Sequence, residues 1–203
     1  MLAEQELERI AHITRQTLGF YRDSNKPKQI DVPALIDFVL KLSSNKFTSK
    51  NITIERDFGA CPLILGVQGE FTQVISNLIS NAADAVDSNG TIKVSLECIE
   101  EPGGAVVQVV IEDDGPGIAP EDLDRIFEPF FTTKEDVGTG LGLWVTKEII
   151  DRNGGSIAVR PRSDDGLGGA AFTVHLPVIA DGQNVRPQPL QIDYRATRLS
   201  PSA

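Results

Sequence analysis

The sequence predicts a domain of the α+β class, in which helical segments and β-strands alternate along one chain. Two patterns carry this prediction. Apolar residues at helical spacing favour helices over residues 31–46, 69–86 and 141–153. Short runs rich in β-branched residues and bounded by turns favour strands over residues 51–58, 91–99, 105–112, 156–160 and 170–177.

Local signals mark where several of these elements begin and end. Asp31 stands at an N-cap position, and Pro33 suits the first turn of the helix that follows. Turn residues at 88–90 lead into the strand at 91–99, and those at 102–104 end it. The glycine pair after residue 153 is a typical stop for the last helix.

The segments that flank this body differ from it in character. Residues 1–23 predict an amphipathic helix whose exposed apolar stripe needs a partner, and residues 24–30 predict a polar linker. The compact domain is expected over residues 31–178, followed by a polar, proline-interrupted tail over 179–203.

Composition excludes some classes of function. The 203 residues are 40% hydrophobic and 24% charged, as in soluble globular proteins. A formal net charge of −10 argues against a nucleic-acid binder, because such proteins neutralise phosphates with Lys and Arg. No apolar run approaches the roughly 20 residues of a membrane span, and no secretory leader is visible. We therefore expect a cytoplasmic chain with reduced Cys61 and Cys98, although a longer parent protein could be anchored in a membrane.

Three polar residues of the helix predicted over residues 69–86 are the first candidates for a binding site. Asn77, Asn81 and Asp84 lie at i, i+4 and i+7, so they share a helix face. Asparagine is a mediocre helix former, which suggests that two at this spacing have a function. Their side-chain oxygens suit Mg²⁺, which prefers oxygen ligands and keeps several waters. The alternative is a solvated polar face.

Asp113 ends the strand at 105–112 and precedes Gly115, Gly117 and Ile118. Its carboxylate can accept a hydrogen bond from the exocyclic amine of adenine. The two glycines allow the backbone to approach a purine because they carry no Cβ. An ordinary turn after a strand would explain an Asp-Gly pair, but not the second glycine.

A second glycine-rich block leads directly into the last predicted helix, and it consists of Gly138, Thr139, Gly140, Leu141, Gly142 and Leu143. Backbone N–H groups at a helix N-terminus suit phosphate oxygens. The block lacks the lysine of a phosphate-binding P-loop and the strand-first context of a dinucleotide fold.

Residues 115–140, which join the two glycine blocks, predict a lid that closes on a substrate and excludes water. Phe127, Pro129, Phe130 and Phe131 are expected to anchor it. The polar residues that follow are Thr132, Thr133 and Lys134. Lys134 could approach a terminal phosphate, and a solvated lysine is the alternative.

These blocks resemble the catalytic ATP-binding domain of sensor histidine kinases, in the superfamily shared with gyrase, mismatch-repair ATPases and a heat-shock chaperone. Asn77–Ala85 is similar to the N box of that family and Asp113–Gly117 to its first glycine box. Phe127–Phe131 is similar to the phenylalanine box and Gly138–Gly142 to the second glycine box. The similarity covers about residues 30 to 178.

The resemblance implies a two-layer α/β sandwich of the Bergerat type, with helices on one face of a mixed sheet and a long helix before it. It implies ATP between the helices and the lid, and Mg²⁺ held through Asn81. The ATP-binding residues that it implies are Asn77, Asn81, Asp84, Asp113, Gly115, Gly117, Ile118, Phe130, Thr132, Thr133, Lys134, Gly138, Thr139, Gly140, Leu141, Gly142 and Leu143.

Two positions depart from patterns within the superfamily. Its hydrolytic members have a glutamate as general base four residues before the magnesium-binding asparagine, where this chain has Asn77. An amide cannot take up the proton of water at neutral pH, which favours phosphoryl transfer to another nucleophile. Where the family often has Gly-Thr before the last strand, this chain has Gly169 and Ala170, with Thr173 nearby.

The acceptor histidine is expected outside this chain. Kinases of this family phosphorylate a histidine followed by an acidic or amide residue and soon by proline, whereas Ile13, Thr14 and Arg15 follow His12. His175 is most simply a residue of the final strand. The segment 7–22 instead resembles the second helix of the dimerisation hairpin, so we expect a homodimer through residues 2–22 and no autophosphorylation of this chain alone.

The sequence therefore predicts the ATP-binding part of a two-component histidine kinase, with ATP and Mg²⁺ as cofactors and a response regulator receiver domain as partner. Two alternatives stay open. One is an anti-sigma-type serine kinase, which the helix at 2–22 disfavours. The other is a non-enzymatic dimeric adaptor, which need not bind ATP.

Overall fold

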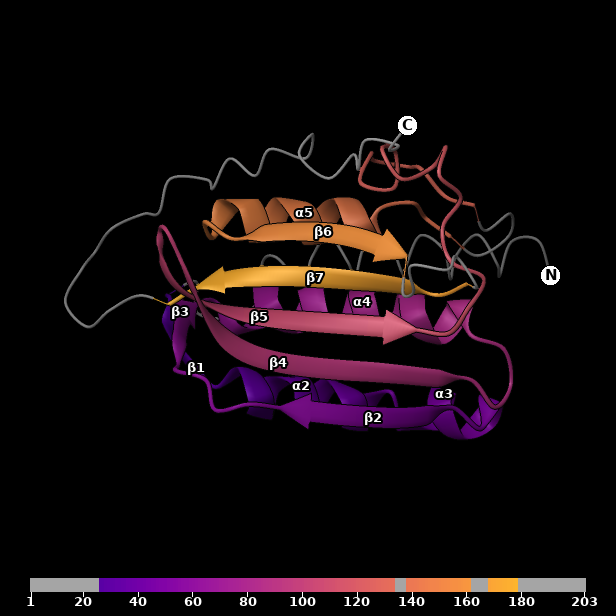
Figure 1. Cartoon of the computed structure of the whole chain (residues 1–203), viewed down its shortest axis with the longest axis horizontal. Helices are drawn as coiled ribbons and strands as arrows, with labels where there is room; N and C mark the ends of the chain where they lie inside the picture. The colour runs from indigo at the N-terminus through magenta and orange to yellow at the C-terminus, as the bar shows by residue number, and fades with distance from the viewer. Residues whose placement is uncertain (1–25, 134–137, 162–167, 179–203) are drawn as a thin grey trace, which may run out of the picture.

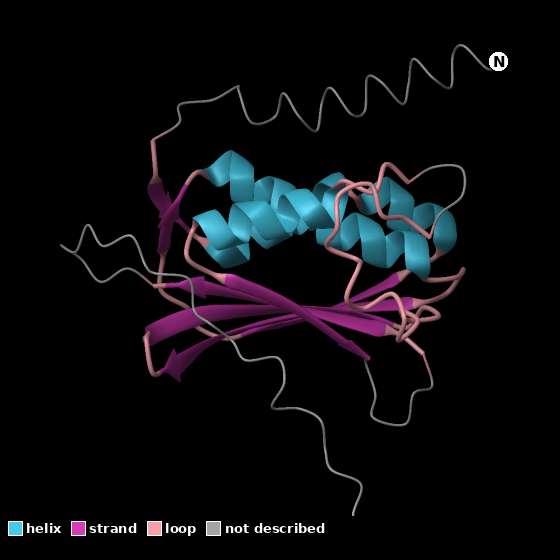
Figure 2. Ribbon diagram, turned by 90° about the horizontal axis from the view of Figure 1, so that it is seen from above, coloured by secondary structure: helices cyan, strands magenta, loops and turns pink. Residues whose placement is uncertain are grey.

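The computed structural model describes residues 26–133, 138–161 and 168–178. The predicted helix at 1–23, the tail at 179–203, His12 and Lys134 lie outside the described residues. In the described ranges the chain forms two layers, with the helices on one side of a β-sheet (Figure 2). This agrees with the α+β sandwich that the sequence predicts.

The main sheet has five strands in the order β2-β4-β5-β7-β6 (Figure 1). Their bounds are β2 Thr53–Phe58, β4 Thr91–Glu101, β5 Gly104–Asp113, β6 Ser156–Pro161 and β7 Ala170–Pro177. β2 runs parallel to β4, and the other neighbours are antiparallel, so the sheet is mixed.

Alternate residues of each central strand face the helices. In β5 these are Val107, Val109 and Ile111, each at most 1% exposed. The register places Asp113 opposite Ile92, a fully buried core residue of β4. Since pairs in register share a face of the sheet, the carboxylate of Asp113 lies on the helix side, at the edge of the hydrophobic core.

Three larger helices and a short one cover that face of the sheet, and they are α2 Val32–Leu42, α3 Ser44–Lys50, α4 Gln68–Ala85 and α5 Gly142–Arg152. α4 packs against α2 on one side and α5 on the other. Leu78 and Ile79 of α4 are fully buried, because their side of the helix rests on the sheet. Because α4 lies between two other helices on the sheet, the polar residues of its C-terminal half lie close to its neighbours.

The first helical stretch is broken where the sequence predicts one helix over 31–46. Asp31 caps α2 as expected, since its Oδ1 accepts from the backbone N–H of Ala34 at 3.0 Å. α2 ends at Leu42, and α3 begins at Ser44 and ends at Lys50, before Asn51, whose φ of 53° is left-handed. The serine pair at this point explains the break, because serine competes with helical hydrogen bonding and favours caps.

Two short strands, β1 Lys28–Ile30 and β3 Ile64–Gly66, pair with each other in a separate sheet. The sequence places residues 28–30 in a linker and predicts no strand at 64–66. The large side chains that these two strands bury in the core are those of Ile30 and Ile64. Strands of three residues are too short to show the alternation from which longer strands are predicted.

Among the described residues, no helix has the length and apolar character that a membrane span requires. His175 lies within β7, as the sequence suggests, with its Nδ1 2.9 Å from Oε1 of Glu101.

Candidate functional site

Asn77 joins the two helices that border the predicted site. Its Nδ2 donates to the backbone carbonyl of Gly142 at 3.0 Å and to Oγ1 of Thr146 at 3.2 Å. Gly142 is the first residue of α5, and Thr146 lies one turn further along that helix. The N-box helix and the second glycine block, which are distant in sequence, are therefore in direct contact.

Asp113 is the most deeply buried acidic residue among those described, with 2% of its surface exposed. Its Oδ1 accepts from the backbone N–H groups of Gly115 at 3.0 Å and Ala170 at 3.4 Å. These bonds from two loops fix the carboxylate, because a buried charge needs hydrogen-bonding partners. A fixed and desolvated acceptor of this kind can select a ligand by its N–H donor.

The first glycine box is closely packed against a second glycine pair just before β7. A Cβ at Gly115 would lie 2.8 Å from the carbonyl oxygen of Ala85, at the end of α4. Gly117 has a φ of +80°, and its added Cβ would lie 3.1 Å from the carbonyl oxygen of Gly169. Gly169 in turn donates to the carbonyl of Gly115 at 2.6 Å. In the sequence Gly169 is notable only for its neighbour Ala170, and no pattern there indicates that it supports the glycine box.

The hydroxyl of Thr173 does not replace the missing threonine at position 170. In the register of β5 and β7, Thr173 pairs with Val110, one residue out of phase with the pairs that face the helices. It therefore lies on the opposite face of the sheet from Asp113.

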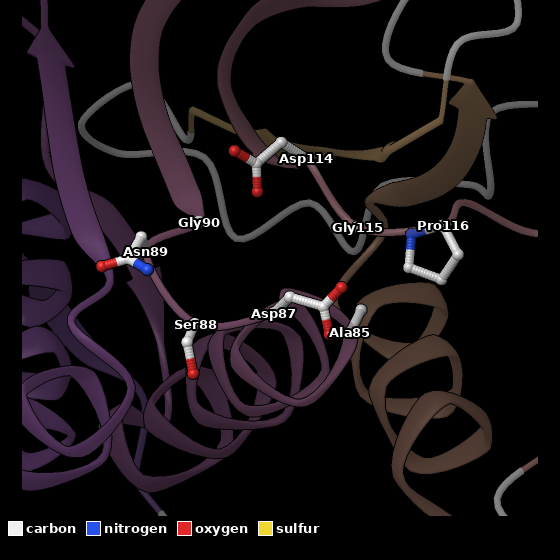
Figure 3. Close-up of a pocket in the computed structure, with 8 residues that line it drawn as sticks. All are labelled: Ala85, Asp87, Ser88, Asn89, Gly90, Asp114, Gly115 and Pro116. Carbon is white, nitrogen blue, oxygen red and sulfur yellow. The ribbon is translucent and has the colours of Figure 1, made fainter.

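A cavity of about 430 Å³ lies beside the first glycine box (Figure 3). It is lined by Ala85, Asp87, Ser88, Asn89, Gly90, Asp114, Gly115 and Pro116. Of the predicted site residues it includes Gly115 alone, so it extends the site outward from Asp113 rather than covering Asn77. Asp87 and Asp114 make its walls acidic, and Oδ2 of Asp114 accepts from the N–H of Thr91 at 2.8 Å.

Phe130, within the lid, is joined to Gly140 at the end of the lid. The N–H of Phe130 donates to the carbonyl of Gly140 at 3.0 Å, and both residues have a left-handed φ, 66° and 65°. A left-handed phenylalanine is a backbone outlier, of the kind that gathers at functional sites. The side chain of Phe130 is 75% exposed, so the expectation that it anchors the lid is wrong.

The other two phenylalanines expected to anchor the lid do so, whereas Pro129 is exposed. Phe127 and Phe131 pack against the core, and Ile126, which the sequence analysis did not single out, is 7% exposed. The guanidinium of Arg125 lies 4.5 Å from the ring centroid of Phe131, a cation–π contact. Thr132 and Thr133 are exposed, beyond this anchor.

α5 begins without a side-chain cap. Leu141 occupies the N-cap position and offers no side-chain acceptor to the first turn, which also contains no acidic residue. The N–H of Leu141 reaches Oγ1 of Thr139 at 3.4 Å. The first N–H groups of the helix can therefore donate hydrogen bonds to anionic oxygens, and the helix dipole favours such a ligand.

The remaining predicted residues are placed as follows. Asn81 is partly buried on α4, one turn after Asn77. Asp84 is exposed, and Nζ of Lys46 lies 2.6 Å from its Oδ1 and 3.0 Å from Oγ of Ser80, so α3 holds this end of the polar face. Ile118 and Leu143 are partly buried against the core.

The donor set around α4 fits a magnesium ion that binds through the nucleotide. No cluster of three His, Cys, Asp or Glu side chains occurs in the described ranges. Asn77 and Asn81 would supply amide oxygens, and Mg²⁺ typically completes its shell with phosphate oxygens and water. The ion would neutralise the charge of the phosphates.

Comparison with known proteins agrees with this geometry. Residues 66–180 match the family described as histidine kinase-, DNA gyrase B-, and HSP90-like ATPase. The sensor histidine kinase ZraS of Salmonella typhimurium is 39% identical over 182 residues, which are 88% of this chain and 35% of that protein. The two-component sensor PprA of Pseudomonas aeruginosa is 41% identical over 60% of this chain and 13% of its own length. The chain thus spans about a third or less of these curated relatives.

Solved structures give the same result. The nucleotide-free catalytic domain of histidine kinase ThkA is 32% identical, with a TM-score of 0.66 over 75% of this chain and 97% of that domain. Full-length ShkA in complex with AMPPNP is 27% identical, with a TM-score of 0.69 over 83% of this chain and 36% of that one. Since the family match covers more than half of the chain, this protein belongs to the histidine kinase-, DNA gyrase B- and HSP90-like ATPase family, and its domain is of the sensor histidine kinase type.

Proposed function

We propose that this domain binds ATP with Mg²⁺ and presents the γ-phosphate to a histidine outside the chain, for relay to a response regulator. Asp113 recognises the adenine amine, and the first glycine box lies along the purine. The uncapped start of α5 binds phosphate oxygens, while Asn81, with Asn77, holds Mg²⁺ against them. Asn77 offers no base for water, so the γ-phosphate remains available to the acceptor.

The observation that carries this proposal is the fixed carboxylate of Asp113. It is 2% exposed and held by two backbone N–H groups, on the same face of the sheet as α4 and α5. A solvated turn residue would not be buried at this cost. In this proposal Asp113 meets the base of the ligand and the N-terminus of α5 meets its phosphate chain.

Several parts of the proposal concern functions of a longer protein, since this chain spans about a third of the length of ZraS. We propose that residues 2–22 contribute to a homodimer and that the domain works on the cytoplasmic side of any membrane. A solved structure of ThkA in complex with response regulator protein TrrA, similar to this chain at 27% identity and a TM-score of 0.70, supports a receiver domain as the partner.

The test measures nucleotide binding and phosphoryl transfer on the same variants. Asp113→Asn replaces one acceptor oxygen by a donor amide, which opposes the adenine amine. We expect at least about a tenfold loss of MgATP affinity by calorimetry, since a hydrogen bond to a charged group is worth about 1.5–3 kcal/mol. Transfer of labelled phosphate to an added dimerisation hairpin that contains an acceptor histidine should fall with it.

The matched control is Asp57→Asn, an exposed carboxyl of β2. It should leave both affinity and transfer unchanged. Equal MgATP affinity in Asp113→Asn and wild type would refute the adenine assignment. Binding of MgATP by the wild type without any transfer would favour the non-enzymatic adaptor, and label on a serine of a protein substrate would favour a serine kinase.

A further inference from the structure

We propose that Thr146 is a positioning residue, which acts through Asn77 to present the Asn77 oxygen to the Mg²⁺–phosphate end of the site. The inference rests on the proposed function for its consequence. Its structural basis is the contact between Asn77 and α5.

The acceptors on α5 determine the orientation of the Asn77 amide. The carbonyl oxygen of Gly142 can only accept, so the atom of Asn77 that lies 3.0 Å from it must be the nitrogen. The second acceptor, Oγ1 of Thr146, lies 3.2 Å from the same nitrogen. Both amide hydrogens are therefore directed toward α5.

Within the part of the chain that the structure describes, Oδ1 of Asn77 makes no hydrogen bond and is not a buried orphan. An amide whose two donors face one helix must present its oxygen elsewhere, because the group is planar. Mg²⁺ binds oxygen atoms of this kind, and a water bound to Mg²⁺ can donate a hydrogen bond to one.

Thr146 is well placed to hold this arrangement. It is 0% exposed, one of three buried polar or charged residues in the described ranges. Its neighbours Val145 and Ile149 are core residues, so the hydroxyl is in a position where valine would normally fit. A hydroxyl buried among apolar neighbours requires a partner, and Asn77 supplies it.

The pair also connects two parts of the site. Gly142 and Thr146 lie at the start of the helix that receives phosphate, while Asn77 lies one turn before Asn81 on α4. A change in the position of α5 moves the acceptors of the Asn77 amide. The metal end and the phosphate end of the site are thus kept in one geometry by a single side chain.

The decisive variant is Thr146→Val, which keeps the shape and removes the acceptor. With a non-hydrolysable ATP analogue, we expect the Mg²⁺ concentration at half-saturation to rise about three- to tenfold, the size of one neutral hydrogen bond. Binding of the same analogue without Mg²⁺ should change less than about twofold. Thr146→Ser, which retains the hydroxyl, should restore the Mg²⁺ response.

A second readout needs no nucleotide. In the wild type, NMR should show the side-chain amide protons of Asn77 protected from exchange with water, and Thr146→Val should expose one of them. Thr72→Val is the matched control, because the Thr72 hydroxyl donates within α4 itself, to the carbonyl of Gln68 at 2.8 Å, and not to Asn77. It should change neither readout.

The outcomes separate this inference from the proposed function. An unchanged Mg²⁺ response in Thr146→Val, or an equal loss of binding with and without Mg²⁺, overturns the positioning role. Unprotected Asn77 amide protons in the wild type overturn its structural basis. If the wild type binds no nucleotide while those protons are protected, the proposed function fails and the contact between the helices stands as a purely structural one.

Discussion

At the scale of single residues, the site is built from backbone positions that admit no side chain. Gly115, Gly117 and Gly140 each lie where an added Cβ would meet a backbone oxygen or carbon within 3.1 Å. Two of the three also have a left-handed φ. The glycines allow separate segments of backbone to approach one another, and Asp113 is held beside Gly115.

Gly140 gives a direct test of this close packing. A Cβ at Gly140 would lie 2.3–2.7 Å from backbone atoms of Phe130, and its φ is +65°. Gly140→Ala should therefore displace the base of the lid, lower the free energy of unfolding by about 1–3 kcal/mol and weaken MgATP binding. Urea unfolding and calorimetry measure the two effects.

Gly69→Ala is the control, because nothing lies within 4 Å of a Cβ at that position in the first turn of α4. It should be neutral or stabilise the fold by up to about 1 kcal/mol. Equal effects of the two substitutions would contradict the account of the lid.

The two cysteines should differ in reactivity. Burial raises the pKa of the Cys61 thiol, and the nearby groups Cys98 and Glu97 raise it further, because additional negative charge disfavours a thiolate. Cys98 is exposed. Alkylation followed by mass spectrometry should label Cys98 first at pH 8, and the labelling of Cys61 should increase at a higher pH than that of an ordinary thiol.

The same shift has a consequence for stability. The folded pKa of Cys61 lies above its ordinary value of 9.0, so the unfolded chain loses this proton first as the pH rises. The contribution of Cys61 to the free energy of unfolding is therefore fully present below pH 9, and it declines as the pH rises through the raised pKa. Faster labelling of Cys61 than of Cys98 at pH 8 would contradict the raised pKa of Cys61, on which both expectations depend.

At the scale of elements, α4 is held from both sides. Asn77 connects it to α5, and two lysines of α3 connect it to the other flank. Nζ of Lys50 lies 2.9 Å from the carbonyl oxygens of Ala83 and Val86 and 3.4 Å from that of Asp84. A cation is thus bound to the carbonyls at the C-terminal end of α4, where the helix dipole favours positive charge.

Lys50→Met should show how much this contact contributes. It keeps the length of the side chain and removes the charge and donors, leaving partly buried carbonyls without that partner. We expect a loss of about 1–3 kcal/mol in the free energy of unfolding, measured in urea. Lys28→Met, at an exposed position of β1, should change it by less than about 0.5 kcal/mol. A loss of stability in Lys50→Met no larger than that in Lys28→Met would show that the contacts of Lys50 with α4 contribute little.

At the scale of the whole molecule, the sequence predicts the long elements and the composition of the site, and misses contacts between distant segments. The periodic segments at 69–86 and 105–112 correspond closely to α4 and β5, because each is long enough to display its repeat. The three-residue strands β1 and β3 show none. Phe130 belongs to an aromatic run that suggests burial, yet its left-handed backbone turns the side chain to solvent.

The partners of a polar residue are also hidden from a single sequence. Spacing predicts that Asn77 and Asn81 share a face, but nothing in it indicates that the Asn77 amide bonds to α5, 65 residues away. Gly169 likewise shows its role only when β7 is paired with β5, which brings it beside Gly115. Such contacts depend on the register of the sheet, which pairwise packing decides.

The small sheet of β1 and β3 provides a short mechanical path into the site. Three residue pairs join β1 to β3, and Val67 alone separates β3 from α4. A Cβ at Gly66 would lie 2.2 Å from the ring of Phe71, so the end of β3 is tightly packed against the first turn of α4. A displacement of β1 is consequently shared between α2, which Asp31 alone separates from it, and α4, the helix that carries Asn77 and Asn81.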